Sequence, residues 1–332
     1  MFAAALNFTM KFSVLKSKNP YFNLAVEEYL LKYSDGEYFL LWQNEPTVVI
    51  GKNQNVFAEV NVPYTKEKGI HIARRITGGG AVYHDLGNLN FSYITNKSEE
   101  GIDFEKYTLP IIEALKEMGL DPVLSGRNDI LISEKKISGN AQTVFGNRVL
   151  HHGTLLYSSN AEILSSALNV DKEKLKAKAI SSVRSRVANI KDFLKEDYSV
   201  SEFQNLIKNH IITKYNAAEF EIKENETIKD LCERNASDAW VFPSSNYLSA
   251  LNFTTKKRYD FGNVEINMEL KNDRICNLKI SGDFFGMKDI SDLEKQLSGI
   301  RLAEVSKKIA NLKISDYIMG MQNEEFLLLI NT

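Results

Sequence analysis

Apolar residues recur at helical spacing in several segments of the first two thirds of the chain. Asn19-Pro20 has the form of an N-cap followed by proline at the first helical position, and apolar side chains then recur on one face up to Tyr33. Residues 103–118 and 201–215 show the same period. We therefore expect an amphipathic helix in each of these segments.

Short apolar or alternating runs predict strands between and beyond these helices. They occupy residues 38–43, 47–50, 70–74, 88–95, 129–132, 137–144 and 149–158. Many of these runs follow one another through hairpin-length turns, and the regular strand–helix alternation of a Rossmann fold is absent from the pattern. The fold class expected is α+β, with mixed, largely antiparallel sheets flanked by helices.

The second half of the chain contains one stretch with strong linker signals, residues 234–247. Beyond it, alternation predicts strands over residues 259–270 and 274–280, and two helices follow. We expect two domains: a large catalytic one over residues 1–245 and a small C-terminal α/β accessory domain over residues 246–332.

Composition narrows the class of protein. The chain has 332 residues, 43% of them hydrophobic and 25% charged, which is typical of an ordinary globular protein. Lys+Arg 41 against Asp+Glu 43 leaves a net charge of −2, so no overall charge favours nucleic acid. No apolar run approaches the ~20 residues of a membrane span, and the first nine residues lack the basic start of a secretory signal. Two cysteines without a CxxC motif predict no disulfide framework and a cytoplasmic protein.

The most informative segment joins Arg74-Arg75 to the three glycines Gly78, Gly79 and Gly80. Consecutive glycines cost roughly 0.5–1 kcal/mol each in regular structure, so a chain that keeps them needs positive φ or a close approach of its backbone to another group. Beside two arginines, that group is expected to be an anion. No P-loop, GxGxxG, HExxH or GxSxG motif is present, so a tight turn with surface arginines is an equal alternative.

A lysine pair, Lys135-Lys136, enters a predicted strand after the polar turn at residues 125–129. Because neighbouring strand residues point to opposite faces, an inward Ile137 would leave Lys136 on the other surface of the sheet. A solvated hairpin tip is the more common interpretation of such a pair.

Two further segments contain side chains that could take part in binding. His151-His152 lie next to each other on a strand and face opposite ways, so packing or hydrogen bonding is a better interpretation than a two-histidine metal site. The basic, small-residue stretch 176–189 suits a loop that closes over a phosphate-bearing ligand, and a solvent-exposed basic loop is its alternative.

Taken in their order and spacing, these segments closely resemble lipoate–protein ligases, adenylating enzymes related to biotin ligases and class II aminoacyl-tRNA synthetases. The matching residues are 22–28, 47–51, 74–75, 78–82, 84–88, 125–129, 136, 138–139, 151–155 and 182–187. Residues 259–265 and 282–285 are similar, more loosely, to the family's small accessory domain. One departure is Ile76-Thr77, where some relatives carry serines.

The resemblance implies a two-step reaction. Lipoate and ATP give lipoyl-AMP and pyrophosphate, and the acyl group then passes to a lysine of an acceptor domain, in a 2-oxoacid dehydrogenase E2 subunit or the glycine cleavage H protein. Lys136 matches the family's essential lysine, which contacts the lipoyl carbonyl oxygen and the α-phosphate. Two unit charges ~4 Å apart repel by about 4 kcal/mol at an effective dielectric near 20, so a fixed cation between carboxylate and phosphate removes a barrier.

The resemblance also implies the rest of the site. ATP and lipoyl-AMP would be held by Arg75, Gly80, Ala81, Val82, Tyr83, Lys136, Lys178, Ser182 and Arg184. Lipoate would be held by Arg75, Gly78, Gly79, His84, Lys136, Ser138, Gly139 and His152. Residues 178–185 resemble the loop that covers the adenylate and excludes water from it. Mg²⁺ is expected with the triphosphate, with Asp129 as its candidate ligand, and the chain is expected to act as a monomer without nucleic-acid or membrane partners.

Two alternatives remain. An octanoyl or lipoyl transferase of the same fold carries the acyl group on a cysteine, and Cys232 and Cys276 both lie outside the matching segments. A non-catalytic lipoate-binding protein would not need Lys136 or the 178–185 loop. ATP dependence tests the first alternative, and pyrophosphate release tests the second.

Overall fold

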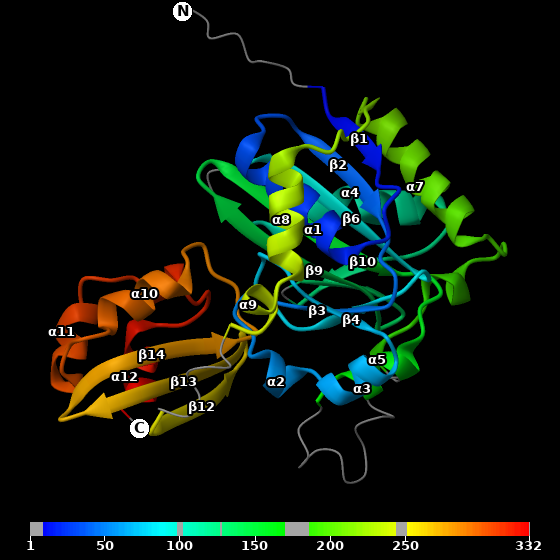
Figure 1. Ribbon diagram of the computed structural model, residues 1–332. Coiled ribbons are helices and arrows are strands. Elements are labelled where there is room, and N and C mark those ends of the chain that lie inside the picture. The colour runs from blue at the N-terminus through cyan, green and yellow to red at the C-terminus, as the bar shows by residue number, and fades with distance from the viewer. Residues whose placement is uncertain (1–8, 98–101, 127, 170–185, 244–250, 332) are drawn as a thin grey trace, which may run out of the picture.

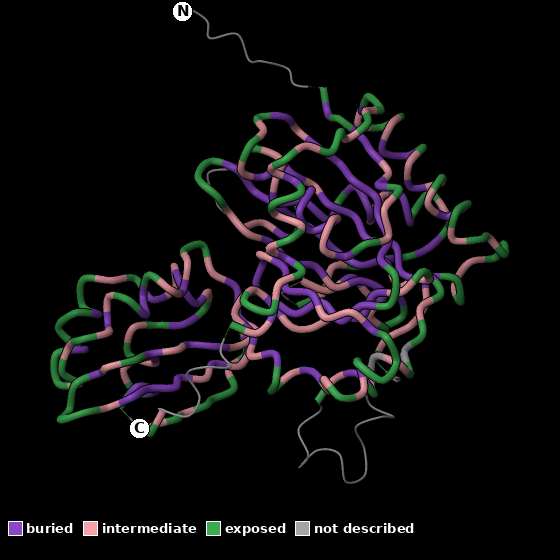
Figure 2. The backbone as a smooth tube through the Cα atoms, in the orientation of Figure 1, coloured by how far each residue is buried: buried purple, intermediate pink, exposed green. Residues whose placement is uncertain are grey.

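The chain folds into two lobes, a large one and a smaller C-terminal one, as the ribbon in Figure 1 shows. The computed structural model describes residues 9–97, 102–126, 128–169, 186–243 and 251–331. The described residues up to 243 form the large lobe, and residues 251–331 form the C-terminal lobe. Each lobe has its own apolar core, and buried residues, purple in Figure 2, occur in both lobes.

The large lobe is built on a main sheet with the strand order β11-β1-β2-β6-β10-β9-β8-β7. Its strands are β1 (Lys11–Val14), β2 (Tyr38–Trp42), β6 (Asn88–Asn96), β7 (Val123–Ser125), β8 (Asp129–Ile132), β9 (Lys135–Phe145), β10 (Arg148–Leu156) and β11 (Ala218–Glu219). The pairs β1–β2 and β1–β11 are parallel, and the other pairs are antiparallel. The expected mixed, largely antiparallel sheet is confirmed.

Helices cover both faces of the main sheet. α4 (Phe104–Glu117) and α7 (Val200–Lys214) pack on one face, and α1 (Pro20–Tyr33) packs on the other with α8 (Glu226–Ala236) beside it. The Asn19 side chain accepts hydrogen bonds from the backbone N–H groups of Tyr21 and Phe22, and Pro20 is the first residue of α1. The three predicted helices are therefore confirmed.

A second sheet lies against the first and carries the glycine segment. Its order is β4-β3-β5, with β3 (Thr47–Ile50) parallel to β4 (His71–Arg74) and antiparallel to β5 (Val82–His84). Apolar side chains of this sheet pack with the short helices α2 (Val56–Glu59), α3 (Val62–Glu67) and α5 (Ala161–Ala167). The glycine loop, residues 75–81, connects β4 to β5 of this second sheet.

The C-terminal lobe packs a three-stranded antiparallel sheet against helices. Its elements are β12 (Phe253–Tyr259), β13 (Gly262–Lys271), β14 (Arg274–Gly282), α10 (Ile290–Leu297), η2 (Leu302–Glu304), α11 (Val305–Ile309), η3 (Ile314–Asp316) and α12 (Asn323–Ile330). The sequence predicted two strands and two helices in this lobe. The prediction missed β12, because its exposed lysines and arginine mask the strand pattern, and it missed one of the three α-helices.

The predicted linker at residues 234–247 is wrong over its first half. α8 extends to Ala236, and Ser237 caps the next helix, α9 (Asp238–Val241), through a bond from Trp240 N. Residues 244–250 lie outside the described residues, so the domain boundary after residue 245 stays a prediction. None of the described helices is long and apolar enough to cross a membrane.

Candidate active site

A pocket, partly open to solvent, lies between the main sheet and the glycine loop. It is lined by residues of both sheets, of α1 and of the loop: Leu24, Trp42, Val49, Arg75, Gly80, Ala81, Val82, His84, Asn90, Asn128, Lys136, Gly139, Asn140, Ala141, His152, Gly153 and Thr154. Eight residues proposed from the sequence therefore meet at one pocket.

The pocket is elongated across the strands. Trp42 on β2 pairs with Asn90 on β6, and Asn90 pairs with Thr154 on β10. The next strand is β9, which carries Lys136. Three inter-strand spacings of ~4.8 Å separate β2 from β9, so the ends of the pocket at Trp42 and Lys136 are about 14 Å apart. One end presents a cation and the other an indole, which suits an acid with a medium-length apolar tail.

Lys136 is held at one end of this pocket by an ion pair. Its Nζ lies 2.8 Å from Asp129 Oδ1, and both side chains are 34% exposed. The pairing of β8 with β9 shifts register between Ile130 and Leu131, and this irregularity lets Lys136 reach over Gly139, three residues along the strand. Ile137 is fully buried in the core, so the expected orientation, with Lys136 on the opposite surface, is confirmed.

The two arginines are buried structural groups. Arg75 is 5% exposed and donates to Thr77 Oγ1 (2.9 Å) and to the carbonyl oxygens of Val49 (3.1 Å), Gly78 (2.8 Å) and Gly80 (2.7 Å). Burial lowers the pKa of Arg75 to about 10. The alternative of a tight turn with surface arginines is wrong, because these guanidinium groups hold backbone carbonyls that would otherwise lack donors.

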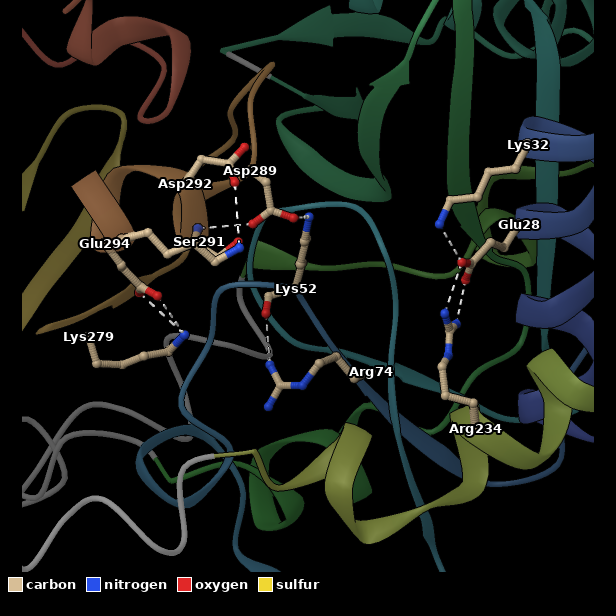
Figure 3. A network of polar contacts seen from close by, with 11 residues as sticks. Glu28, Lys32, Lys52, Arg74, Arg234, Lys279, Asp289, Ser291, Asp292 and Glu294 are labelled. Atoms are coloured by element: carbon tan, nitrogen blue, oxygen red, sulfur yellow. Dashed lines mark hydrogen bonds and ion pairs between the residues drawn. The ribbon is translucent and has the colours of Figure 1, made fainter. Parts of the chain in front are cut away.

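Arg74 ties the loop to other parts of the large lobe. Its guanidinium donates to the carbonyl oxygens of Gly51, Lys52, Gln54, Trp240 and Val241. Trp240 Nε1 in turn donates to the Arg74 carbonyl oxygen at 2.9 Å. Figure 3 shows Arg74 meeting Lys52, whose ammonium forms an ion pair with Asp289 of the C-terminal lobe at 2.6 Å. The loop is thereby fixed to α9 and, through Lys52, to the other lobe.

Gly78 and Gly79 face the C-terminal lobe. A Cβ on Gly78 would stand 2.4 Å from the Phe284 carbonyl oxygen, and one on Gly79 would stand 3.0 Å from the Phe285 ring. Gly79 also has φ +91 and donates its N–H to Phe284 O at 3.3 Å. Close backbone approach between lobes explains these two glycines. They do not line the pocket as described, so lipoate contacts from them stay a prediction.

A buried hydrogen-bond chain runs beneath the pocket from α1 to the glycine loop. His152 Nδ1 lies 2.9 Å from Glu27 Oε1, and His152 Nε2 lies 2.8 Å from Thr77 Oγ1, which also accepts from Arg75 Nε. Ser92 Oγ donates to Glu27 at 2.5 Å. The order Thr–His–Glu resembles a hydrolase triad, but Thr77 is fully buried and its oxygen is occupied by Arg75. This series of hydrogen bonds therefore positions Arg75 and supplies no nucleophile.

Sequence reasoning assigned no role of their own to Glu27 and Thr77. A glutamate on the apolar side of a helix is a usable signal, because a buried carboxylate needs partners. Glu27 is 1% exposed, and its neighbour Glu28 is bound by Arg234 and Lys32 (Figure 3). Thr77 carries no such signal, since its role depends on a histidine 75 residues further along the chain.

The remaining predicted residues lie at the edge of the pocket or outside the described residues. Tyr83 lines a neighbouring pocket with Val187 and Ala188, and burial raises the pKa of its phenol to about 12. Ser138 is fully buried and accepts a bond from Asn140 Nδ2 at 3.3 Å. Lys178, Ser182 and Arg184 lie outside the described residues.

The segment that follows these undescribed residues returns to the site. Ala188 N donates to the Lys136 carbonyl oxygen at 3.0 Å, and Val187 forms a parallel bridge with Lys136. The end of the basic stretch 176–189 is thus attached to the strand that carries the site lysine.

The cysteines are remote from the pocket. Cys232 lies in α8 and Cys276 in β14, and neither contributes to the pocket lining. Burial, with Glu224 and Glu233 nearby, raises the pKa of the Cys232 thiol, which disfavours a thiolate. No cysteine of the described chain is therefore positioned to carry an acyl group in this pocket.

Comparison with known proteins defines the class. The sequence model "Lipoyl protein ligase A/B catalytic domain" matches residues 19–212, and "Bacterial lipoate protein ligase C-terminus" matches residues 249–330. The two lobes are thus those of a protein-modifying ligase with a catalytic and a C-terminal domain.

Individual relatives agree with this class. The chain is 41% identical over 323 residues to lipoate-protein ligase LplJ of Bacillus subtilis (94% of this chain, 97% of the relative) and 41% identical over 287 residues to lipoate–protein ligase 1 of Staphylococcus aureus (85% and 87%). Among solved structures, P. falciparum LipL1 in complex with lipoate superposes with TM-score 0.76 at 26% identity (92% and 94%). Lipoate-protein ligase A bound with ATP gives TM-score 0.59 at 28% identity (71% and 99%).

The chain belongs to the lipoate–protein ligase family and is an enzyme. The resemblance found in the sequence, and the α+β fold class expected from it, are both confirmed.

Proposed function

We propose that this enzyme joins free lipoate to ATP, forming lipoyl-AMP, and transfers the lipoyl group to a lysine of an acceptor protein. In the first step a lipoate carboxylate oxygen bonds to the α-phosphorus and pyrophosphate leaves. In the second step the acceptor amine bonds to the carbonyl carbon, AMP leaves, and the amine gives up a proton. Family membership and two solved relatives, one with lipoate and one with ATP, support both substrates.

One observation carries the proposal: among the described residues, a single ammonium group, Lys136 Nζ, lines a pocket that also reaches Trp42, about three strand spacings away. A carboxylate at the polar end and a neighbouring α-phosphate would both gain from this cation, which offsets their repulsion while the new bond forms. The acyl tail would extend across the strands toward Trp42, where each buried methylene contributes about 0.8 kcal/mol.

Asp129 holds the Lys136 ammonium at 2.8 Å before any substrate anion does. Such a pair orients the side chain, and incoming phosphate and carboxylate oxygens then compete for its hydrogens. Mg²⁺ bound to ATP commonly takes one or two protein carboxylates and fills its other positions with phosphate and water. Asp129, a partly exposed carboxylate beside the proposed phosphate position, fits that need and would hold the ion there. The bound ion would neutralise charge on the triphosphate.

The nucleotide is proposed to bind along the glycine loop and the start of β5. Gly80, Ala81 and Val82 line the same pocket as Lys136, Tyr83 lines the neighbouring pocket, and Arg75 fixes the loop by donating to the Gly80 carbonyl oxygen. Lys178, Ser182 and Arg184 are proposed to cover the adenylate, as the family resemblance implies.

The acceptor is proposed to be a lipoyl domain, of a 2-oxoacid dehydrogenase E2 subunit or of the glycine cleavage H protein. A bipartite lipoate protein ligase studied with its E2 lipoyl domain, from Thermoplasma acidophilum, superposes on this chain with TM-score 0.63 at 30% identity. Action as a cytoplasmic monomer is part of the same proposal.

A transferase mechanism is disfavoured by the position and ionisation of the cysteines. Such an enzyme needs a thiolate beside the acyl carbonyl. Cys232 has a raised pKa, and the described pocket lining contains no thiol.

The test is pyrophosphate release on mixing the purified chain with lipoate and ATP, followed by mass spectrometry of an added lipoyl domain. We expect pyrophosphate in amounts equal to the lipoylated acceptor and no product without ATP. Product formed from an octanoyl carrier protein in the absence of ATP would instead identify a transferase.

A further inference from the structure

The end of the pocket at Trp42 contains two buried polar side chains, His84 and Asn90. They are 3% and 1% exposed, and both line the pocket. His84 Nε2 and Asn90 Nδ2 have no hydrogen-bond partner among the residues that the structure describes. Buried polar atoms are almost always paired, so two unpaired ones in a single pocket point to a group that arrives with the ligand.

The hydrogen-bond network determines which nitrogen of His84 carries the proton. Asn23 Nδ2 lies within hydrogen-bond distance of three acceptors, the carbonyl oxygens of Ser17 and Gln43 and, at 2.9 Å, Asn44 Oδ1. Its two hydrogens are shared among these three oxygens, which fixes the orientation of the Asn23 amide and turns the Asn44 oxygen toward it. The other atom of that amide, Asn44 Nδ2, must then donate to His84 Nδ1 at 3.0 Å. His84 Nδ1 is therefore an acceptor, and in the neutral ring the proton resides on Nε2.

The ring stays neutral at physiological pH. Burial, followed by the charges of Arg75 and His152, lowers the pKa of His84 to about 3. The pocket thus presents a neutral N–H donor on His84.

Asn90 offers a second polar group at the same end. Asn88 Nδ2 donates to Asn90 Oδ1 at 2.8 Å, which leaves the Asn90 amide nitrogen for another partner. Exchanging both amide orientations would present the Asn90 oxygen instead, so an unpaired polar atom persists either way.

These groups lie where the end of an acyl tail would be. The His84 ring contacts the Trp42 ring edge-on, with centroids 5.8 Å apart, and Trp42 is about three strand spacings from Lys136. The indole nitrogen is already satisfied by Ser92 at 2.7 Å, so Trp42 contributes an apolar wall and His84 contributes the free donor. A plain hydrocarbon tail would bury that donor without a partner.

Resting on the proposed function, we infer that His84, supported by Asn90, is a specificity-determining residue that selects the sulfur-containing ring of lipoate over the methyl end of octanoate. Sulfur is a weak acceptor, but even a weak acceptor is favoured over a hydrocarbon at a buried, unpaired N–H. Asn44 and Asn23 are positioning residues that keep the proton on His84 Nε2, from which it can be donated to the ring sulfur.

The experiment compares His84→Gln with His84→Met in the full-length enzyme. The two side chains are similar in size, but only glutamine keeps an N–H donor near the Nε2 position. The measured quantity is the ratio of kcat/KM for lipoate to kcat/KM for octanoate, from ATP-dependent pyrophosphate release. We expect the ratio to fall about tenfold in His84→Met and to stay near the wild-type value in His84→Gln.

The ratio of the two kcat/KM values changes with specificity and not with a general loss of activity, so a partly impaired variant remains informative. Equal ratios in wild type, His84→Met and His84→Gln would overturn the inference while leaving the ligase activity established. Absence of ATP-dependent pyrophosphate release from the wild type would instead overturn the proposed function.

A second readout needs no catalysis. In ¹⁵N-labelled wild-type enzyme, the His84 imidazole should give the long-range ¹⁵N–¹H pattern of the neutral Nε2–H form from pH 6 to about 8. Lipoate should shift its Nε2 resonance more than octanoate does. An Nδ1–H pattern, or equal shifts with both acids, would contradict the assignment.

Discussion

Gly139 leaves open the space that the Lys136 ammonium occupies. A Cβ on Gly139 would lie 2.9 Å from Lys136 Nζ and 3.0 Å from its Cε. Asp129 pairs directly with Gly139 in the sheet and bonds the same ammonium from the neighbouring strand. The site lysine is thus positioned by a residue with no side chain and by a carboxylate opposite it.

Replacing Lys136 by alanine should abolish lipoyl-AMP formation without unfolding the protein. The side chain is partly exposed and its loss breaks one ion pair, so the melting temperature should change little. Loss of the cation should lower the rate of pyrophosphate release by a factor of at least about 100.

Lys135→Ala is the matched control for this variant. Lys135 is the exposed neighbour on the same strand and does not line the pocket, so its loss should leave pyrophosphate release near the wild-type rate. Near-wild-type activity in Lys136→Ala, or equal losses in both variants, would remove Lys136 from the mechanism.

Gly139→Ala tests the space beneath the ammonium. The atom that a new methyl group meets is the end of a flexible side chain, so the fold should accommodate it with a change in unfolding free energy below about 1 kcal/mol. The displaced ammonium should nonetheless lower kcat about tenfold, because small misplacements of a catalytic group are costly. Thermal unfolding and pyrophosphate release measure the two effects, and an unchanged kcat would show that the exact position of Nζ is unimportant.

The elements of the large lobe could be predicted from sequence because their signals are local. Asn19-Pro20 marks the start of α1, and alternation marks β6. The role of Arg75 could not be predicted in this way, since its acceptors come from Val49 and from the loop that follows it. Whether an arginine faces an anion or its own backbone depends on contacts between segments, which spacing along the chain does not contain.

The glycine loop illustrates the same limit. The sequence correctly indicates that Gly78 and Gly79 need a close neighbour, but the neighbour in the structure is Phe284-Phe285, more than 200 residues away. For the pocket, by contrast, the sequence did identify residues that lie together in the structure. Lys136, Gly139 and His152 were found through the family resemblance, and all three line the pocket.

Gly79→Val should act through the C-terminal lobe and not by filling the tail pocket. The new side chain would meet the Phe285 ring and Arg75 Nη2 at 3.0 Å, at a backbone φ of +91 that valine rarely adopts. We expect a loss of about 2–4 kcal/mol in unfolding free energy, measured by urea denaturation.

The double variant Gly79→Val, Phe285→Ala separates the two sources of that cost. Removing the ring should relieve the steric part and leave the backbone strain, so the two changes should be less than additive. Fully additive losses would show that Phe285 does not carry the clash. Weaker lipoate binding in Gly79→Val with unchanged stability would restore the original expectation that Gly79 borders the tail.

Glu59→Gln should stabilise the protein at pH 8. Burial raises the pKa of Glu59, and Asp283 and Glu265 of the C-terminal lobe raise it further, against the opposing effect of Lys256. The folded state therefore binds this proton more tightly than the unfolded state, in which a glutamate has a pKa of about 4.3. Ionised Glu59 costs stability above its folded pKa, and that cost disappears as the pH falls through the folded pKa toward about 4.

The amide keeps the shape of the protonated carboxyl, so Glu59→Gln should raise Tm by about 2 °C at pH 8. The advantage should persist above the folded pKa of Glu59 and shrink as the pH falls through that pKa toward about 4.5, because the wild-type carboxyl then takes up its own proton. Glu67→Gln, at an exposed position on α3 paired with Lys68, is the control and should show no such trend. A Tm difference for Glu59→Gln that is independent of pH, measured by scanning calorimetry, would mean that burial and the nearby carboxylates do not raise the pKa of Glu59 in the folded protein.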